Sequence, residues 1–147
     1  MEVQVQSATE SDMSLLTVMN QQLIKDEGSQ NPMNNEQLRE RMLDWIQGDW
    51  HVDLLLAGDE VIGYAVYQFR KGHYHTEVTD VYLRQYFIKR EYRSKGYGLS
   101  GIEKLKKERF KEVENLEIDE LECNLKGQNF WRKAGFEPYY INMRMKL

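Results

Sequence analysis

The 147-residue chain is short of the residue types that mark several classes of protein. Its one cysteine, Cys123, excludes an internal disulfide and a cysteine-rich metal site. It has two prolines and no low-complexity tract, so we expect neither a linker nor a disordered region. No apolar run approaches a membrane span, and the N-terminus lacks the basic start and apolar block of a signal peptide. We therefore expect a cytoplasmic protein with no metal and no membrane partner.

Basic residues are also scarce in the first half of the chain and concentrated in the segment that follows it. The net charge of −4 argues against nucleic-acid binding. Residues 84–111 nevertheless hold ten basic and three acidic side chains, whereas residues 1–83 hold five basic and fourteen acidic ones. A basic segment in an acidic chain indicates an anionic ligand there, and the acidic first half suits a cationic one. A solvated basic helix face would explain the same charges without a ligand.

The spacing of apolar residues predicts a single-domain α/β fold over residues 1–147. Alternation predicts strands at residues 2–7, 51–57, 61–69, 78–88, 116–125 and 136–147. Helical spacing predicts helices at residues 10–27, between Asn34 or Asn35 and Gly48, at 98–113 and at 126–134. The order β-α-α-β-β-β-α-β-α-β contains a right-handed parallel unit and predicts a mixed β-sheet sandwiched by helices.

The most informative segment lies where the strand at 78–88 gives way to the helix at 98–113. A helix N-terminus carries unpaired N–H groups and a positive dipole end, and Gly96 and Gly98 let the backbone approach a ligand closely. With Arg93 and Lys95, the segment therefore predicts an anion site that fits a pyrophosphate. It is not a P-loop or a dinucleotide fingerprint, because it lacks the residues that these motifs need after the second glycine.

Two motifs resemble those of the GCN5-related N-acetyltransferase (GNAT) family. The family's Arg/Gln-x-x-Gly-x-Gly/Ala turn is similar to residues 93–98, RSKGYG. Its Asn-x-x-Ala-x-x-x-Tyr-x-x-x-Gly-Phe segment is similar to residues 124–136, NLKGQNFWRKAGF. The order of elements also agrees, although before residue 80 the likeness is one of topology alone.

The resemblance implies a cosubstrate and a reaction. Acetyl-CoA would lie between the strands at 78–88 and 116–125, and its acetyl group would pass to a primary amine by direct attack on the thioester. Its pyrophosphate would lie on the amides of the turn and its pantetheine beside the end of the first strand. The cofactor-binding residues implied in this way are Phe87, Ile88, Arg93, Ser94, Lys95, Gly96, Tyr97, Gly98, Asn124, Phe130 and Trp131.

Two positions depart from the family's catalytic pattern. Arg84 stands where many members carry a glutamate base, and Trp131 stands where the tyrosine acid is usual. Indole is no practical proton donor to a thiolate. A general base and a general acid must therefore come from other residues, or from water.

Carboxylates and tyrosines on nearby strands are the alternatives. Glu122 and Asp80 are the candidate bases, although a surface or salt-bridged carboxylate explains each of them as well. Tyr140, or its neighbour Tyr139, is the candidate acid, unless both pack as plain aromatic residues. His73 titrates in a suitable range, as does His75, but a solvated loop explains both histidines.

Two neighbouring residues of the second motif have their own interpretations. Asn124 is predicted to hydrogen-bond pantetheine or the splayed backbone, with a strand-ending cap as the alternative. Cys123 lies between Leu121 and Leu125 at alternating positions, so we expect it to be buried and inert.

Three functions remain in competition. The first is an acetyl-CoA-dependent N-acetyltransferase acting on a small-molecule or peptide amine, which the acidic first half suggests is cationic. The second is a non-catalytic acyl-CoA-binding sensor or assembly module, which Arg84 and Trp131 favour. The third, a nucleotide-phosphate binder of another family, is disfavoured by the missing P-loop residues. Whether the chain forms a homodimer is left open.

Overall fold

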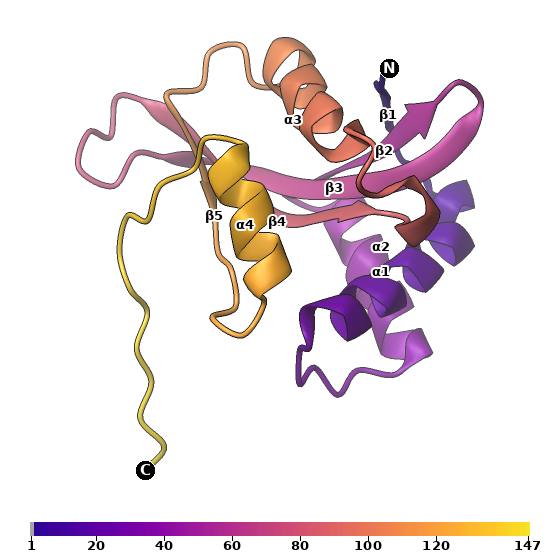
Figure 1. The fold of residues 1–147 in the computed structure, drawn as a ribbon, viewed down its shortest axis with the longest axis horizontal. Coiled ribbons are helices and arrows are strands. Elements are labelled where there is room, and N and C mark those ends of the chain that lie inside the picture. Colours follow the sequence, from indigo (N-terminus) through magenta and orange to yellow (C-terminus); the bar gives the residue numbers. More distant parts are fainter. Residues whose placement is uncertain (1) are drawn as a thin grey trace.

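The structure, a computed structural model, describes residues 2–147 and contains one mixed sheet between two layers of helices (Figure 1). Its strands are β1 (Gln4–Ser7), β2 (His51–Ala57), β3 (Glu60–Lys71), β4 (Thr79–Ile88) and β5 (Asn115–Ile118). They lie in sequence order across the sheet, antiparallel from β1 to β4 and parallel between β4 and β5. The predicted α/β fold with a mixed sheet sandwiched by helices is confirmed.

The helices cover both faces of this sheet. They are α1 (Met13–Glu27), α2 (Asn35–Gln47), α3 (Tyr97–Glu108) and α4 (Leu125–Lys133), with short 3-10 turns η1 (Glu10–Asp12) and η2 (Arg90–Tyr92). One buried cluster joins α1 and α2 to one face, and another joins α3 and α4 to the other face. No helix within residues 2–147 is long and apolar enough to cross a lipid bilayer.

Local signals fix the connection between α1 and α2. α1 ends at Gly28, whose φ of 69° lies in the left-handed region, and the Gly28 amide donates to the carbonyls of the preceding turn. α2 begins at Asn34, which forms a capping box with Gln37 through two hydrogen bonds of 2.9 Å. Of the two caps predicted for this helix, Asn34 is the one used. These two caps set where α1 ends and where α2 begins.

A buried ion pair fastens the end of α3 to the sheet. The Asp53 side chain on β2 is almost fully buried, and it accepts hydrogen bonds from the Tyr67 hydroxyl (2.6 Å) and from Arg109 Nε (3.1 Å). Burial, followed by the hydrogen bond to this carboxylate, raises the pKa of Tyr67 far above its usual value. Removing Arg109 would leave a buried charge without its partner, which proteins tolerate poorly.

A β-bulge distorts β4 near its middle. Tyr67 of β3 lies opposite Leu83, while its neighbour Val66 lies opposite Gln85, so Arg84 is the extra residue of the bulge. A bulge breaks the alternation of side chains and re-aims them. Arg84 and Gln85 therefore both face α1 and α2, where Arg84 contacts Trp45 and Gln85 contacts Tyr64.

β4 and β5 separate beyond this bulge. Their parallel pairing runs only from Asp80 opposite Asn115 to Leu83 opposite Ile118. β4 then continues to Ile88, paired on its β3 side alone. The separation expected between these strands is confirmed, but the expected strand at 116–125 ends at Ile118. It ends there because residues 121–124 close a turn that leads into α4, with the Asn124 amide donating to the Leu121 carbonyl.

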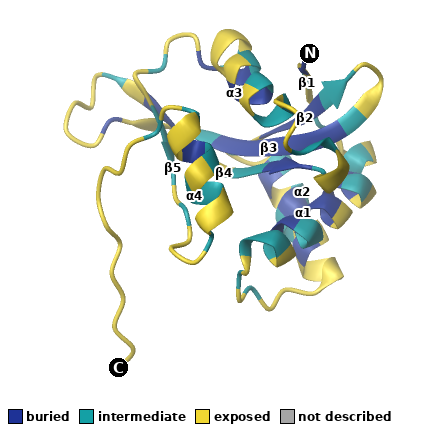
Figure 2. Cartoon of the chain, in the orientation of Figure 1, coloured by how far each residue is buried: buried dark blue, intermediate teal, exposed yellow. Residues whose placement is uncertain are grey.

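The strand expected at 136–147 does not form, and that prediction is wrong. α4 ends before Gly135, and the residues after it pair with no strand in the part of the chain that the structure describes. Phe136 still packs against Trp131. From residue 137 the segment runs away from the body of the molecule, and its side chains are exposed (Figures 1 and 2). The apolar pattern that predicted a strand is present, but within residues 2–147 the segment does not pair with the outer edge of β5.

Candidate active site

The turn between β4 and α3 presents a row of unpaired amides. After η2, Ser94 and Gly96 adopt left-handed conformations, with φ of 60° and 89°, and α3 begins at Tyr97. Within residues 2–147, the amides of residues 94–98 find no hydrogen-bond acceptor. Turns that contain left-handed residues and helix N-termini both form concave anion-binding sites, because their backbone N–H groups point toward one place. The turn therefore has the row of free N–H groups that the predicted pyrophosphate site needs.

The basic side chains of the turn are bound to the protein itself. Arg93 donates through Nε to the Ile88 carbonyl (2.7 Å) and through Nη2 to Asp26 of α1 (2.6 Å). Arg90 binds the other oxygen of Asp26 (2.6 Å), and Lys95 reaches the Glu91 carbonyl (3.0 Å). Arg93 thus ties α1 to the turn, which is a structural role beside the phosphate role predicted for it.

This clamp is sensitive to acid. Burial alone would raise the pKa of Asp26, but hydrogen bonds from Arg90 and Arg93 outweigh it and hold the pKa below its usual value. A lowered carboxylate pKa contributes stability above the pKa of the unfolded chain. That contribution is lost as the pH falls through the folded value. The attachment of α1 to the turn is therefore complete at neutral pH.

Aromatic residues pack α4 against the start of α3. A Cβ atom at Gly98 would lie 2.7 Å from the Phe130 ring, so the glycine makes room for that ring. The Tyr86 hydroxyl donates to the Gly98 carbonyl (2.6 Å), and the Tyr86 ring stacks on Phe130. Gly98 thus serves the packing of Phe130 in addition to any approach of a ligand.

The free edge of β4 ends beside this turn. The Lys89 amide donates to the Ile62 carbonyl on the β3 side (2.7 Å). Because successive amides of a strand point to opposite edges, the Ile88 amide faces the separated side. The Phe87 side chain is buried under α1 and α2. Of the two residues expected beside pantetheine, Ile88 is the one whose backbone lies on the open edge.

Two carboxyl groups interact electrostatically where the loop after β5 meets the end of α1. Glu27 ends α1, and Glu120 lies in the loop after β5; the same loop meets α1 where Cys123 Sγ contacts the Glu27 carbonyl (3.9 Å). Burial, followed by the charge of Glu120, raises the pKa of Glu27 to about 7. No donor within residues 2–147 binds the Glu27 carboxylate, so it is free to accept a proton.

Glu120 is held in place by α4. Its Oε1 accepts from Asn124 Nδ2 (2.6 Å), and its Oε2 accepts from Trp131 Nε1 (2.9 Å). Asn124 also caps α4, since its Oδ1 accepts from the Gly127 amide (3.2 Å). Asn124 therefore caps the start of a helix, not the end of a strand as the alternative had it. Trp131 positions the Glu120 carboxylate.

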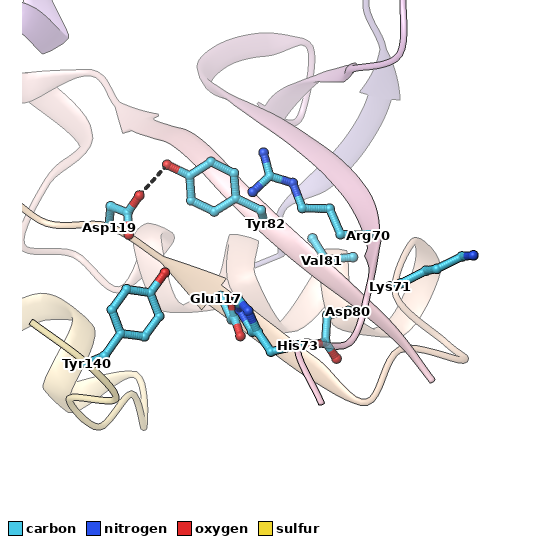
Figure 3. Close-up of a pocket in the computed structure, with 9 residues that line it drawn as sticks. All are labelled: Arg70, Lys71, His73, Asp80, Val81, Tyr82, Glu117, Asp119 and Tyr140. Atoms are coloured by element: carbon cyan, nitrogen blue, oxygen red, sulfur yellow. Dashed lines mark hydrogen bonds and ion pairs between the residues drawn. The ribbon is translucent and has the colours of Figure 1, made fainter. Parts of the chain in front are cut away.

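The residues predicted as acid and base lie elsewhere. Asp80 is buried, and it accepts two hydrogen bonds from Asn115 at the start of β5. Tyr140 lines the same shallow pocket as Asp80, next to His73, at the far end of β4 from the turn (Figure 3). Glu122 is exposed in the loop before α4 rather than on a strand. The structure brings Asp80 and Tyr140 together and leaves Glu122 apart from both.

The sequence interpretation missed Glu27 and Glu120, and it misplaced Cys123. Cys123 is exposed, not buried, because the strand that would have buried it ends at Ile118. One signal for Glu27 was available. Acidic side chains are disfavoured at the C-terminal end of a helix dipole, yet Asp26 and Glu27 end α1. Nothing in the sequence alone places them against the β5–α4 loop.

A comparison with protein-family models matches residues 20–136 to the Acetyltransferase (GNAT) family. A search of curated proteins finds no match. Several solved structures share the fold at low sequence identity. A possible acetyltransferase from Clostridium difficile 630 has a TM-score of 0.78 and 12% identity, with 100% of this chain and 98% of that one covered.

Two further solved structures are similar over nearly their whole length. A GNAT family acetyltransferase from Staphylococcus aureus has a TM-score of 0.72 and 17% identity, with 100% of both chains covered. An aminoglycoside acetyltransferase from an uncultured soil metagenomic sample has a TM-score of 0.74 and 13% identity, with 99% of this chain and 96% of that one covered. At such identities the likeness concerns the fold alone.

Proposed function

The chain belongs to the GNAT acetyltransferase family, and we propose that it transfers the acetyl group of acetyl-CoA to a primary amine. In this reaction the amine nitrogen attacks the thioester carbon and the carbon–sulfur bond breaks, giving an N-acetyl amine and CoA. The unpaired amides of residues 94–98 carry the proposal, because a pyrophosphate needs such a row of donors. A cytoplasmic location remains a prediction from the single cysteine.

Residues of this chain suit each part of the cosubstrate. The turn at 94–98 would bind the pyrophosphate, with Lys95 adding charge. The open edge of β4 at Ile88 would pair with the pantetheine, and the aromatic rings of Phe130 and Trp131 would lie along its far side. The same free edge offers a backbone N–H to the oxyanion that develops during transfer.

Glu27 is proposed as the general base in place of the predicted carboxylates. An ammonium must lose a proton before its nitrogen can attack, and a base with a pKa near 7 is suited to accept it at neutral pH. The pKa of Glu27, about 7, meets this condition. Both oxygens of the Glu120 carboxylate already accept hydrogen bonds, from Asn124 and Trp131. We therefore propose that Glu120 orients and polarises the groups of the transfer site. Asp80 is bound to Asn115 and is not retained as the base.

The acceptor is proposed to be a small amine. One structural neighbour is an aminoglycoside acetyltransferase in complex with sisomicin, which favours a small-molecule acceptor over a peptide. The non-catalytic module remains the alternative. Its support was the absence of a glutamate at Arg84 and of a tyrosine at Trp131, and a base at Glu27 removes the first of these arguments.

Binding of acetyl-CoA tests the cofactor site directly. We expect saturating acetyl-CoA to raise the free energy of unfolding by about 2.7 kcal/mol at a hundredfold excess over its Kd. Replacing Lys95 by Ala should weaken binding in calorimetry and leave kcat nearly unchanged, because phosphates keep their charge during transfer. Lys111→Ala, an exposed residue beyond the C-terminal end of α3, is the matched control. No binding of acetyl-CoA or of CoA would overturn the proposal.

A further inference from the structure

Three arginines gather over aromatic rings on the α2 side of the sheet without an acidic partner. Arg41 of α2 and Arg84 of the β4 bulge both lie against the Trp45 ring, at 4.6 and 5.1 Å from its centroid. Arg84 also lies 5.4 Å from the centroid of Trp50, and Arg70 lies over that ring as well. Arg41 and Arg84 are therefore within about 10 Å of each other, although both carry a positive charge.

The other arginines that face the sheet or the turn are paired, which makes this group unusual. Arg90 and Arg93 bind Asp26, and Arg109 binds Asp53. Within residues 2–147, no carboxylate lies within 4.0 Å of Arg41 or of Arg84. Arg41 is partly buried and Arg84 is exposed, and their like charges repel each other. An anion bound between them would offset this repulsion.

Buried donors beside Arg41 lack acceptors. Arg41 Nε is buried and finds no partner within residues 2–147, and the same holds for Nδ2 of the fully buried Asn20. The Asn20 Oδ1 accepts from Arg41 Nη2 at 3.3 Å. Burial and then the charge of Arg84 lower the pKa of Arg41. Buried N–H groups without partners are costly and rare, so an acceptor from outside the chain would satisfy them.

This group lies next to the proposed transfer site. Arg84 and Gln85 both belong to the bulge where β4 leaves β5, and Gln85 accepts from the buried Tyr64 hydroxyl (2.8 Å). The charges of Arg41 and of Glu27 both act on that hydroxyl. Arg41 and the proposed base, Glu27, therefore both lie near the Tyr64 hydroxyl. One small molecule could reach both groups.

We propose that Arg41 and Arg84 bind an anionic group, a carboxylate or a phosphate, carried by the amine that is acetylated. The inference rests on the proposed function and names its acceptor class: an amino acid or a phosphorylated amine. The amine would face Glu27 while the anion lies between the two guanidinium groups over Trp45. The cationic acceptor suggested by the acidic first half is thereby replaced by a zwitterionic one.

Binding of product-like ligands tests this without turnover. The fluorescence of Trp45 and Trp50 is followed during titration with N-acetyl amino acids, with their neutral amides, and with N-acetyl-O-phosphoethanolamine. We expect one anionic class to bind about tenfold or more tighter than the amides, since charge-assisted hydrogen bonds are lost in the neutral ligand. Arg84→Gln should remove this preference, and the control Arg39→Gln on the exposed side of α2 should keep it.

The outcomes separate the inference from the proposed function. A preference for carboxylates identifies amino acids, and a preference for the phosphate identifies phosphorylated amines. Equal affinity for anionic and neutral ligands, no binding of either, or an unchanged preference in Arg84→Gln overturns the inference. Acetyl-CoA binding is measured separately, so the proposed function stands or fails on its own result.

Discussion

Replacing Glu27 by Gln is expected to lower kcat/KM by about 10²–10⁴-fold, the usual contribution of a general base. The pH profile should change as well. The pKa of Glu27 is about 7, so the parent enzyme should gain activity as the pH rises through 7 and the carboxylate becomes able to accept a proton. Glu27→Gln should lose this rise. Steady-state kinetics from pH 5.5 to 9 measure both effects.

The same substitution should stabilise the fold above neutral pH. A carboxyl group whose pKa is raised from 4.5 to about 7 binds more protons in the folded state between these values, so folding weakens as the pH rises through this window. Allowing for solvent screening, Glu27→Gln should gain about 1–2 kcal/mol at pH 8 and much less at pH 4.5. Glu40→Gln, an exposed residue of α2, should change neither activity nor stability. Parent-like kinetics in Glu27→Gln would exclude it as the base.

Replacing Arg109 by Ala is expected to cost about 3–5 kcal/mol of stability. Asp53 would remain buried with Tyr67 as its one donor, so an uncompensated charge would stay inside the fold. For a chain of this length the melting temperature should fall by roughly 6–15 °C. Differential scanning calorimetry at pH 7 measures this change.

Two variants distinguish the buried charge from a loss of packing. Lys106→Ala removes an exposed ion pair with Glu103 (3.1 Å) and should cost at most about 1 kcal/mol. Adding Asp53→Asn to Arg109→Ala removes the unpaired charge and should recover part of the stability. If the double variant is no more stable than Arg109→Ala, the cost does not come from the charge.

Elements with a strong period and an explicit cap could be predicted from the sequence. Asn34 three residues before Gln37, and Gly28 after the last apolar turn, set the ends of two helices through local hydrogen bonds. The turn at 93–98 could also be predicted from the sequence, since its glycines and the change from strand to helix are local features. Local interactions of this kind depend on neighbours in the sequence.

Features that depend on distant partners could not be predicted. Residues 136–147 have a strand pattern, but a strand also needs a partner strand, and within residues 2–147 this segment pairs with none. The role of Glu120 depends on Trp131, eleven residues away, and the pKa of Glu27 depends on a loop almost a hundred residues further along. Arg84 looked like the loss of a base, whereas the bulge turns it toward Trp45.

The most direct test of the account is a coupled measurement of acetyl transfer. The protein is incubated with acetyl-CoA and a panel of small amines, and free CoA is followed by its thiol while the amines are examined by mass spectrometry. We predict that at least one amine gains one acetyl group for each CoA released, and that Glu27→Gln slows both together. Tight binding of acetyl-CoA with no transfer to any amine would contradict an acetyltransferase and leave the non-catalytic binding module.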